Sequence, residues 1–324
     1  MAEPLPYTVY QYGTHELQRV GVWDLDINSD MAEWHQYWII YIHGGAWRDP
    51  RVTHTTFEPS VERIRKDAFA SRHVAAFASV DYRLSPHPDF PQDPAATPPA
   101  RYRGARHPDH LDDVRAAIRY LQDRFGFGGR YVLVGHSAGA TLAYQIAMTT
   151  TTADDQDQDG DGGSSTSRRG GDHPDGLPAT GDVIAPPTAL CGLEGIYDFH
   201  GLNDRKGGAY AEFLTAAFGD PAGWDAAAPM KCIGRGAPSD GGDSELWVLA
   251  HSPDDELVDM PETDGMARRL LEDAGPGGED RVLLIRDLSG KHDDVWRDGG
   301  GVARVVSRTL HYIEEVLRAG EDAS

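Results

Sequence analysis

Tyr131-Val132-Leu133-Val134-Gly135-His136-Ser137-Ala138-Gly139 is an apolar run followed at once by a Gly-x-Ser-x-Gly pattern. A helical pattern of apolar residues continues from 140 to 148. A strand, a tight turn and a helix in this order hold the central serine in strained backbone angles, with its hydroxyl at the carboxyl edge of a sheet. We therefore interpret Ser137 as a candidate nucleophile rather than as part of an ordinary glycine-rich turn.

Strand and helix patterns alternate along most of the chain. Short apolar runs predict strands at 36–42, 74–80, 131–134, 188–193, 246–250 and 282–285, and continuous runs of this kind suit strands covered on both faces. Two sets of apolar residues share helical spacing: Leu111, Val114, Ile118 and Leu121, and Val302, Val305, Val306, Leu310, Ile313 and Leu317. The alternation predicts a mostly parallel sheet with helices on both faces, and the serine turn makes this the α/β-hydrolase fold. Residues 20–27 predict an additional antiparallel edge strand.

The serine needs partners, because a hydroxyl is a weak nucleophile at neutral pH without a base. In this fold the catalytic residues follow in the chain order Ser, then Asp or Glu, then His. His292 comes after the predicted strand 282–285 and before the last helical pattern, which makes it the candidate base; the later His311 lies inside that pattern. The acid should follow the strand 246–250, where a run of carboxylates leaves the choice open on spacing alone. A common pattern of Asp before a polar residue and an apolar pair favours Asp255 over Asp254.

Acyl transfer also requires hydrogen-bond donors aimed at the oxyanion. The segment His43-Gly44-Gly45-Ala46-Trp47 follows the predicted strand 36–42, and glycines there allow backbone N–H groups to approach a ligand closely. We expect Gly44 and Gly45 to form an oxyanion hole together with the amide of Ala138. His43 is interpreted as a structural residue that holds this loop, and the segment 81–86 is expected to brace it through hydrogen bonds and ion pairs.

Composition restricts the partners and the location of the protein. The formal net charge of −22 repels nucleic acid and anionic membrane surfaces, so we expect neither as a partner. No apolar run approaches the roughly 20 residues that span a bilayer, and the N-terminus lacks the features of a secretory signal. Two cysteines, Cys191 and Cys232, exclude a disulfide framework. Together these features predict a reducing, cytoplasmic location.

The sequence predicts no metal and no cofactor. The histidines and acidic residues show no local ligand spacing such as His-Glu-x-x-His, and the two cysteines are far apart. No Gly-x-Gly-x-x-Gly or P-loop pattern opens a helix, so no nucleotide cofactor is implied.

One segment does not fit a packed domain. Residues 149–182 begin with a threonine run, continue as an Asp-rich stretch and contain almost no apolar residue, which predicts a disordered acidic insert in a single domain spanning 1–324. A calcium loop is the alternative, because Asp157-x-Asp159-x-Asp161-Gly162 resembles the start of an EF-hand, but the late Glu and the flanking helices are absent. A second Gly/Pro/Asp-rich stretch, 234–243, predicts another loop. The oligomeric state stays open, a homodimer included.

Several of these motifs resemble one family. His43-Gly44-Gly45-Ala46-Trp47 is similar to the His-Gly-Gly-x-Trp signature of the eukaryotic kynurenine formamidases, or arylformamidases, whereas esterases of the hormone-sensitive-lipase type more often carry a third glycine at Ala46. The serine turn matches the family as well. The blocks His251-Ser252-x-x-Asp255-Glu256-Leu257 and His292-x-Asp294-Val295 resemble the fungal branch. The resemblance covers residues 20–317 apart from the acidic insert.

The resemblance implies hydrolysis of N-formyl-L-kynurenine to L-kynurenine and formate, in tryptophan catabolism toward NAD. Ser137 would be the nucleophile, His292 the base and Asp255 the orienting acid. Trp47, beside the oxyanion loop, would either stack on the aryl ring of the substrate or brace the loop from the core.

Two alternatives remain open at the level of the sequence. A general carboxylesterase acting on small acyl esters would use the same triad, so the triad does not separate it from a formamidase. A catalytically inactive binding module of the same fold would usually lack the serine or the histidine, and both are present here.

Overall fold

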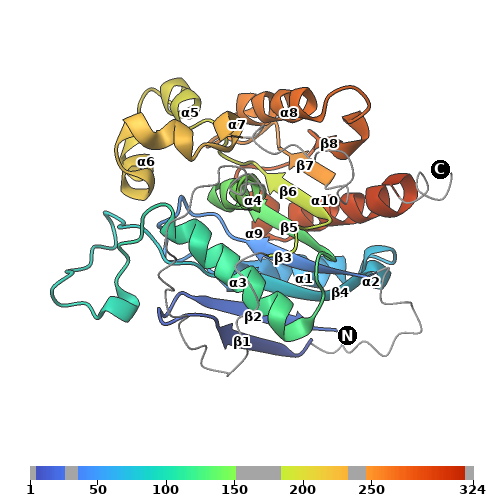
Figure 1. Cartoon of the computed structure of the whole chain (residues 1–324), viewed down its shortest axis with the longest axis horizontal. Coiled ribbons are helices and arrows are strands. Elements are labelled where there is room, and N and C mark those ends of the chain that lie inside the picture. The colour runs from blue at the N-terminus through green and yellow to red at the C-terminus, as the bar shows by residue number, and fades with distance from the viewer. Residues whose placement is uncertain (1–4, 26–35, 151–183, 233–245, 318–324) are drawn as a thin grey trace, which may run out of the picture.

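The strand that carries the serine turn lies near the middle of an eight-stranded sheet (Figure 1). The computed structural model describes residues 5–25, 36–150, 184–232 and 246–317. In these ranges the strand order is β1-β2-β4-β3-β5-β6-β7-β8. The pairs β1–β2 and β2–β4 are antiparallel, and all the others are parallel. The strands are β1 Tyr7–Gln11, β2 Arg19–Asp24, β3 Tyr37–Ile42, β4 Val74–Val80, β5 Tyr131–His136, β6 Ala189–Leu193, β7 Leu246–Ala250 and β8 Val282–Ile285.

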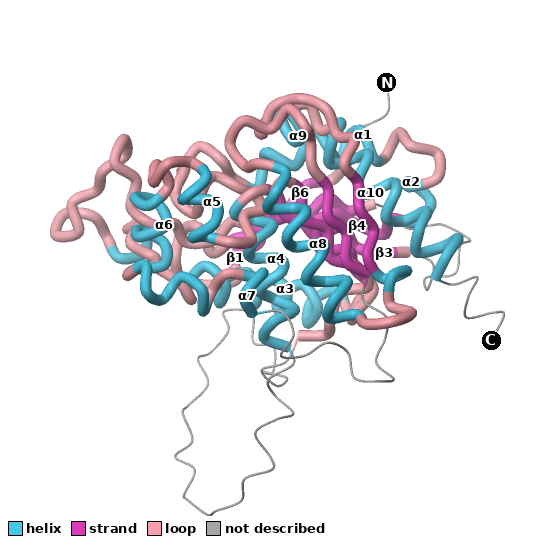
Figure 2. The backbone as a smooth tube through the Cα atoms, turned by 90° about the horizontal axis from the view of Figure 1, so that it is seen from above, coloured by secondary structure: helices cyan, strands magenta, loops and turns pink. Residues whose placement is uncertain are grey.

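Helices cover both faces of this sheet, as Figure 2 shows from above. The helices α3, α4 and α8 lie on one face, and α1, α2, α9 and α10 on the other, while α5 and α6 extend beyond one end of the strands. The helices are α1 Glu58–Ile64, α2 Ala70–His73, α3 Asp109–Phe125, α4 Ala138–Thr150, α5 Phe199–Arg205, α6 Ala211–Phe218, α7 Pro229–Cys232, α8 Met260–Ala274, α9 Asp294–Arg297 and α10 Gly300–Tyr312. Short helical turns complete the described part: η2 His54–Phe57, η3 Pro99–Arg101, η5 Pro221–Ala226, η6 Glu279–Arg281 and η7 Ile313–Leu317.

The apolar runs of the sequence are continuous because both faces of the central strands are buried. Every residue of β3, β4, β5 and β6 is buried. Along β3, Trp38, Ile40 and Ile42 pack toward α3 and α4, whereas the alternate residues Tyr37, Ile39 and Tyr41 pack toward α1 and α10. Alternation of side chains across two apolar layers removes the polar positions that a one-sided strand would show.

The predicted α/β-hydrolase architecture is confirmed, and all six predicted core strands are present. The predicted edge strand was placed wrongly in one respect. β2 is antiparallel as expected, but it is the second strand, because β1 forms the edge. Four of the five residues of β1 are exposed, so that strand carries no buried apolar face that a sequence pattern could reveal.

Most residues of the two segments predicted to be loops lie outside the described residues. α4 continues through Thr149 and Thr150, so the first two residues of the expected acidic insert are helical. The rest of that insert, with the aspartates of the calcium alternative, and the stretch 234–243 lie outside the described residues. Within the described ranges, no helix combines the length and the apolar character that a membrane crossing requires.

The serine turn is a point where backbones cross at very short range. A Cβ at Gly135 would overlap the carbonyl of Gly139, at the start of α4. A Cβ at Gly139 would in turn overlap the carbonyls of Ile42 and His43, where β3 ends. The two glycines of the Gly-x-Ser-x-Gly pattern are thus required for close approach, which lets α4 start directly above the sheet.

This close crossing predicts that alanine substitutions at two glycines differ in their effect on stability. Gly139→Ala is expected to lower the free energy of unfolding by about 3 kcal/mol, because backbone atoms must shift to admit the methyl group. Gly223→Ala is the matched control, since a Cβ there meets nothing within 4 Å, and its effect should stay within about 0.5 kcal/mol. Urea unfolding of both variants measures the difference. Equal stabilities would show that the crossing can relax and does not constrain the fold.

Candidate active site

Ser137 is the single residue between the end of β5 and the start of α4. Its φ is +53°, a left-handed conformation that is strained for a residue with a Cβ. Its amide donates to the carbonyl of Leu193 at 2.9 Å, and its carbonyl accepts from Ala140 and Thr141 in the first turn of α4. The strained turn predicted from the sequence is therefore present, and it is fixed by hydrogen bonds on both sides.

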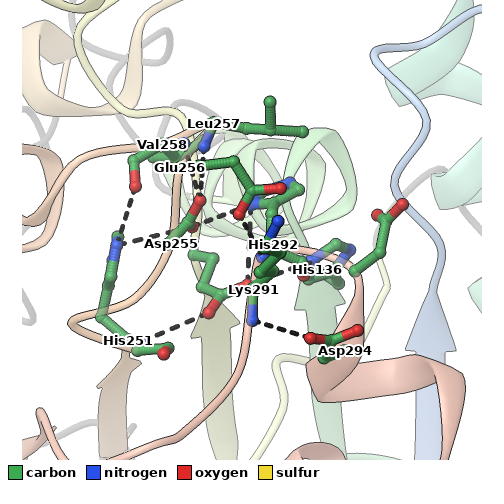
Figure 3. Close-up of polar contacts among 12 residues, drawn as sticks. His136, His251, Asp255, Glu256, Leu257, Val258, Lys291, His292 and Asp294 are labelled. Atoms are coloured by element: carbon green, nitrogen blue, oxygen red, sulfur yellow. Dashed lines mark hydrogen bonds and ion pairs between the residues drawn. The ribbon is translucent and has the colours of Figure 1, made fainter.

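His292 and Asp255 come together from two different loops, after β8 and after β7 (Figure 3). His292 Nδ1 lies 2.8 Å from Asp255 Oδ2, and both side chains are almost fully buried. The other carboxylate oxygen, Oδ1, accepts from the amides of Leu257 and Val258 at 2.8 and 2.9 Å. Asp254, the alternative acid, is exposed. The geometry thus pairs His292 with Asp255.

The protonation of this pair follows from its surroundings. Burial alone would raise the pKa of Asp255, but the hydrogen bond with His292 and those from the Val258 and Leu257 amides outweigh burial, and the pKa is lowered. An ionised carboxylate can only accept a hydrogen bond. His292 therefore carries its proton on Nδ1, and Nε2 is left as the acceptor that a general base requires.

His136 connects the serine turn to His292. Its Nε2 lies 3.0 Å from the carbonyl oxygen of His292, and the two imidazole rings are 4.6 Å apart between centroids. His292 thus lies beside the residue that precedes Ser137. Among the hydrogen bonds of the described residues, none joins Ser137 Oγ to His292. Catalytic hydrogen bonds are often long before substrate binds and shorten in the complex.

The expected oxyanion loop lies against the serine. A Cβ on Gly44 would be 3.0 Å from Ser137 Cβ and 2.9 Å from His136 Nδ1, so only a glycine fits there. The next three residues all have positive φ: +89° at Gly45, +50° at Ala46 and +58° at Trp47. Three consecutive positive φ values continue neither a strand nor a right-handed helix, and backbone N–H groups in turns form the concave donor sites that bind an oxyanion.

A buried carboxylate holds this loop, which confirms the predicted bracing role of the segment 81–86. Asp81 lies 2.8 Å from His54 Nδ1, 2.7 Å from Arg19 Nε and 3.4 Å from His43 Nε2. Tyr82 stacks on the ring of His43 and donates its hydroxyl to the His43 carbonyl at 3.1 Å. The structural role expected of His43 follows from these contacts.

Trp47 braces the loop from inside. Its side chain has no exposed surface and packs against three rings of the α5–α6 cap, those of Phe199, Phe213 and Phe218. Of the two roles that the sequence left open for Trp47, the core role is the one that this burial supports. A fully covered ring offers no face on which a substrate ring could stack.

Glu194 follows β6 directly and was not predicted from the sequence as a site residue. This carboxyl group is fully buried, and burial raises its pKa to about 9 against the opposing influence of His292. Its Oε2 lies 3.4 Å from His136 Nε2 and 3.6 Å from His292 Nδ1. The signal was available, because parallel strands present their carboxyl ends at one edge of the sheet, and Glu194 follows the predicted strand 188–193.

Among the described residues, His136, Glu194 and His292 form the group of side chains that could hold a metal ion. One ligand atom each of His136, Glu194 and His292 lies within 4.8 Å of the others. Local ligand spacing could not reveal this set, because the three residues come from the ends of different strands. The two histidine nitrogens are already engaged, Nε2 of His136 with the His292 carbonyl and Nδ1 of His292 with Asp255.

Comparisons with known proteins give relatives that match most of the chain. A kynurenine formamidase of Aspergillus versicolor is 35% identical over 82% of this chain and 86% of the relative. A kynurenine formamidase-like hydrolase of Fusarium equiseti is 33% identical over 92% of this chain and 91% of the relative. No protein-family profile matches the chain.

Solved structures share the fold at low sequence identity. An inhibited esterase B from Lactobacillus rhamnosis superimposes with a TM-score of 0.63 at 17% identity, over 99% of this chain and 90% of that chain. A thermophilic esterase from Thermogutta terrifontis gives a TM-score of 0.59 at 16% identity, over 96% and 94%. At this identity the likeness supports the α/β-hydrolase fold and nothing finer.

The Asp81 cluster predicts a pH-dependent contribution to stability. Burial alone would raise the pKa of Asp81, but the hydrogen bonds with His43 and His54 outweigh it and hold the pKa far below its ordinary value. Asp81→Asn should therefore lower the free energy of unfolding near pH 7 by about 3–5 kcal/mol. A carboxyl group whose pKa is lowered in the folded state stabilises the fold at pH values above its unfolded pKa of about 3.9. This contribution is lost as the pH falls toward the pKa of the folded state.

The difference between wild type and Asp81→Asn should thus be largest near neutral pH and shrink below about pH 4. Urea unfolding at both pH values measures it. Asp89→Asn, at an exposed carboxylate, is the control and should change stability by less than about 0.5 kcal/mol. A difference that does not change with pH would contradict the assigned charge of Asp81.

Proposed function

The chain belongs to the fungal kynurenine formamidase family, and from this membership we propose that it hydrolyses N-formyl-L-kynurenine to L-kynurenine and formate. The hydrogen bond between His292 and Asp255, beside the strained turn at Ser137, is the structural observation that supports this proposal. The kynurenine formamidase relatives supply the choice of substrate. The reaction would serve tryptophan catabolism toward NAD.

The first half of the reaction acylates the serine. Ser137 Oγ attacks the formyl carbon while Nε2 of His292 takes the hydroxyl proton. The carbonyl oxygen becomes an oxyanion, and the amides of Gly44, Gly45 and Ala138 are the donors proposed to stabilise it. Asp255 accepts from Nδ1 throughout and stabilises the imidazolium that forms.

Collapse of the tetrahedral intermediate breaks the bond between the formyl carbon and the aryl nitrogen. His292 returns its proton to this nitrogen, and L-kynurenine leaves as a neutral aniline. An aniline nitrogen is a better leaving group than an alkyl amine, so an esterase-like site is adequate for this amide. A water molecule then gives a proton to His292 and attacks the formyl-serine, which releases formate and restores Ser137.

The cap and the oxyanion loop are connected in this proposal. Trp47 links the loop to α5 and α6 through its contacts with Phe199 and Phe218. Arg48 forms an ion pair with Glu212 of α6 beside it. A change in the position of the cap would therefore be transmitted directly to the donors around the oxyanion, and substrate contacts with the cap can influence the turnover rate.

The formamidase assignment predicts a substrate preference. The kcat/KM of the purified protein should be larger for N-formyl-L-kynurenine than for p-nitrophenyl acetate. Ser137→Ala should lower the turnover of both substrates by about 10⁶-fold, because the remaining groups cannot replace the nucleophile. Product formation is followed by the absorbance of kynurenine and of nitrophenolate.

The two substrates separate the possible outcomes. A preference for the ester, with the formamide untouched, would contradict the formamidase proposal in favour of a general carboxylesterase. Full activity of Ser137→Ala on either substrate would instead contradict the role of Ser137 itself.

A further inference from the structure

Glu194 follows β6 and lies beside both His136 and His292. Its backbone has φ of +51°, a strained conformation for a residue with a Cβ, and its amide donates to the carbonyl of Ala250 at 2.9 Å. The side chain is fully buried. Its Oε1 lies 3.3 Å from the amide of Ser252, while Oε2 accepts no hydrogen bond among the described residues and lies 3.6 Å from His292 Nδ1.

The groups around this carboxyl come from three elements. His136 faces it from the end of β5, Asp255 and Glu256 from the loop after β7, and His292 from the loop after β8. Two ionised carboxylates at this burial would repel each other strongly. Asp255 therefore carries the charge, and Glu194 remains a neutral acid, with its pKa raised chiefly by burial and also by Asp255 and Glu256.

We propose that Glu194 is a second acid for His292, a positioning residue placed to accept the Nδ1 hydrogen bond when Asp255 no longer does. This inference rests on the proposed role of His292 as the base. With Asp255 present, the neutral Glu194 adds no second charge to the site. When Asp255 is removed, Glu194 is the remaining carboxyl group beside Nδ1 in the described part of the chain, and ionisation allows it to hold the same tautomer.

Because of the hydrogen bonds of Asp255, two substitutions at this position should affect the tautomer of His292 differently. In Asp255→Asn, the amide oxygen must take the Oδ1 position, because the amides of Leu257 and Val258 donate there. The NH₂ group then points at His292 Nδ1 and imposes the wrong tautomer. In Asp255→Ala, nothing opposes Nδ1, and Glu194 Oε2 is free to approach from its 3.6 Å position.

The test compares these variants in the full-length protein with p-nitrophenyl acetate, so that the preference for a formamide does not enter. Asp255→Asn is expected to lower kcat/KM by about 10⁴-fold, as expected for the wrong tautomer. Asp255→Ala should retain about 10- to 100-fold more activity than Asp255→Asn, a factor that lies within the coupling measured between neighbouring groups. Asp255→Ala with Glu194→Gln should fall to the level of Asp255→Asn.

The dependence on pH distinguishes an acid from a packing residue. Loss of the Asp255 charge removes one influence that raises the pKa of Glu194. The kcat/KM of Asp255→Ala should therefore rise with pH as Glu194 ionises, and this rise should be absent when Glu194→Gln is added. His292 must be neutral in both proteins, so the informative quantity is the difference between their two profiles.

Asp255→Ser serves as a second variant if Asp255→Ala does not fold, because a serine hydroxyl can accept from the same two amides; circular dichroism checks both. Equal activities of Asp255→Ala and Asp255→Asn would overturn the role of Glu194 alone. So would a loss from Glu194→Gln of the same size with and without Asp255. Wild-type activity in Asp255→Asn would overturn the proposed triad, and the role of Glu194 with it.

Discussion

The crossing of three backbone segments at Ser137 is the constraint on which the rest of the site depends. Gly139 at the start of α4 contacts the carbonyls at the end of β3, and Gly135 admits the carbonyl of Gly139. Between them Ser137 is held at φ +53°. Because β3 and β5 are adjacent parallel strands, the same geometry brings the oxyanion loop that follows β3, with Gly44, against the serine. The order of β6, β7 and β8 then brings the loops after them to the same edge.

Three buried carboxyl groups near this edge of the sheet differ in their ionisation. Asp81 is ionised between two histidines and Arg19, and it fixes the loop that carries the oxyanion donors. Asp255 is ionised because His292 and two backbone amides stabilise its charge. Glu194 lacks comparable donors and stays neutral, with a pKa of about 9. Different environments allow one of two neighbouring carboxyl groups to be ionised while the other stays protonated, as in other hydrolytic sites.

The sequence alone was sufficient where a residue's role depends on its neighbours along the chain. The turn around Ser137 and the strands after which His292 and Asp255 stand could be predicted in this way, because an apolar run and a glycine pattern are local signals. Roles that depend on distant strands could not be predicted. Glu194 meets His292 only once β6 and β8 lie in one sheet, and the burial of Trp47 depends on α5 and α6 folding over the loop. The edge strand β1 was missed because it buries almost nothing.

We infer that Ser137 is a nucleophile activated by the pair of His292 and Asp255. This activation can be measured with a fluorophosphonate that reacts covalently with activated serines, followed by mass spectrometry of the intact protein and of its peptides. One adduct per chain is predicted, on the peptide that contains Ser137, at a rate that Asp255→Asn slows strongly and that N-formyl-L-kynurenine suppresses by competition. No adduct, or an adduct on another serine at an unchanged rate in Asp255→Asn, would contradict the claim.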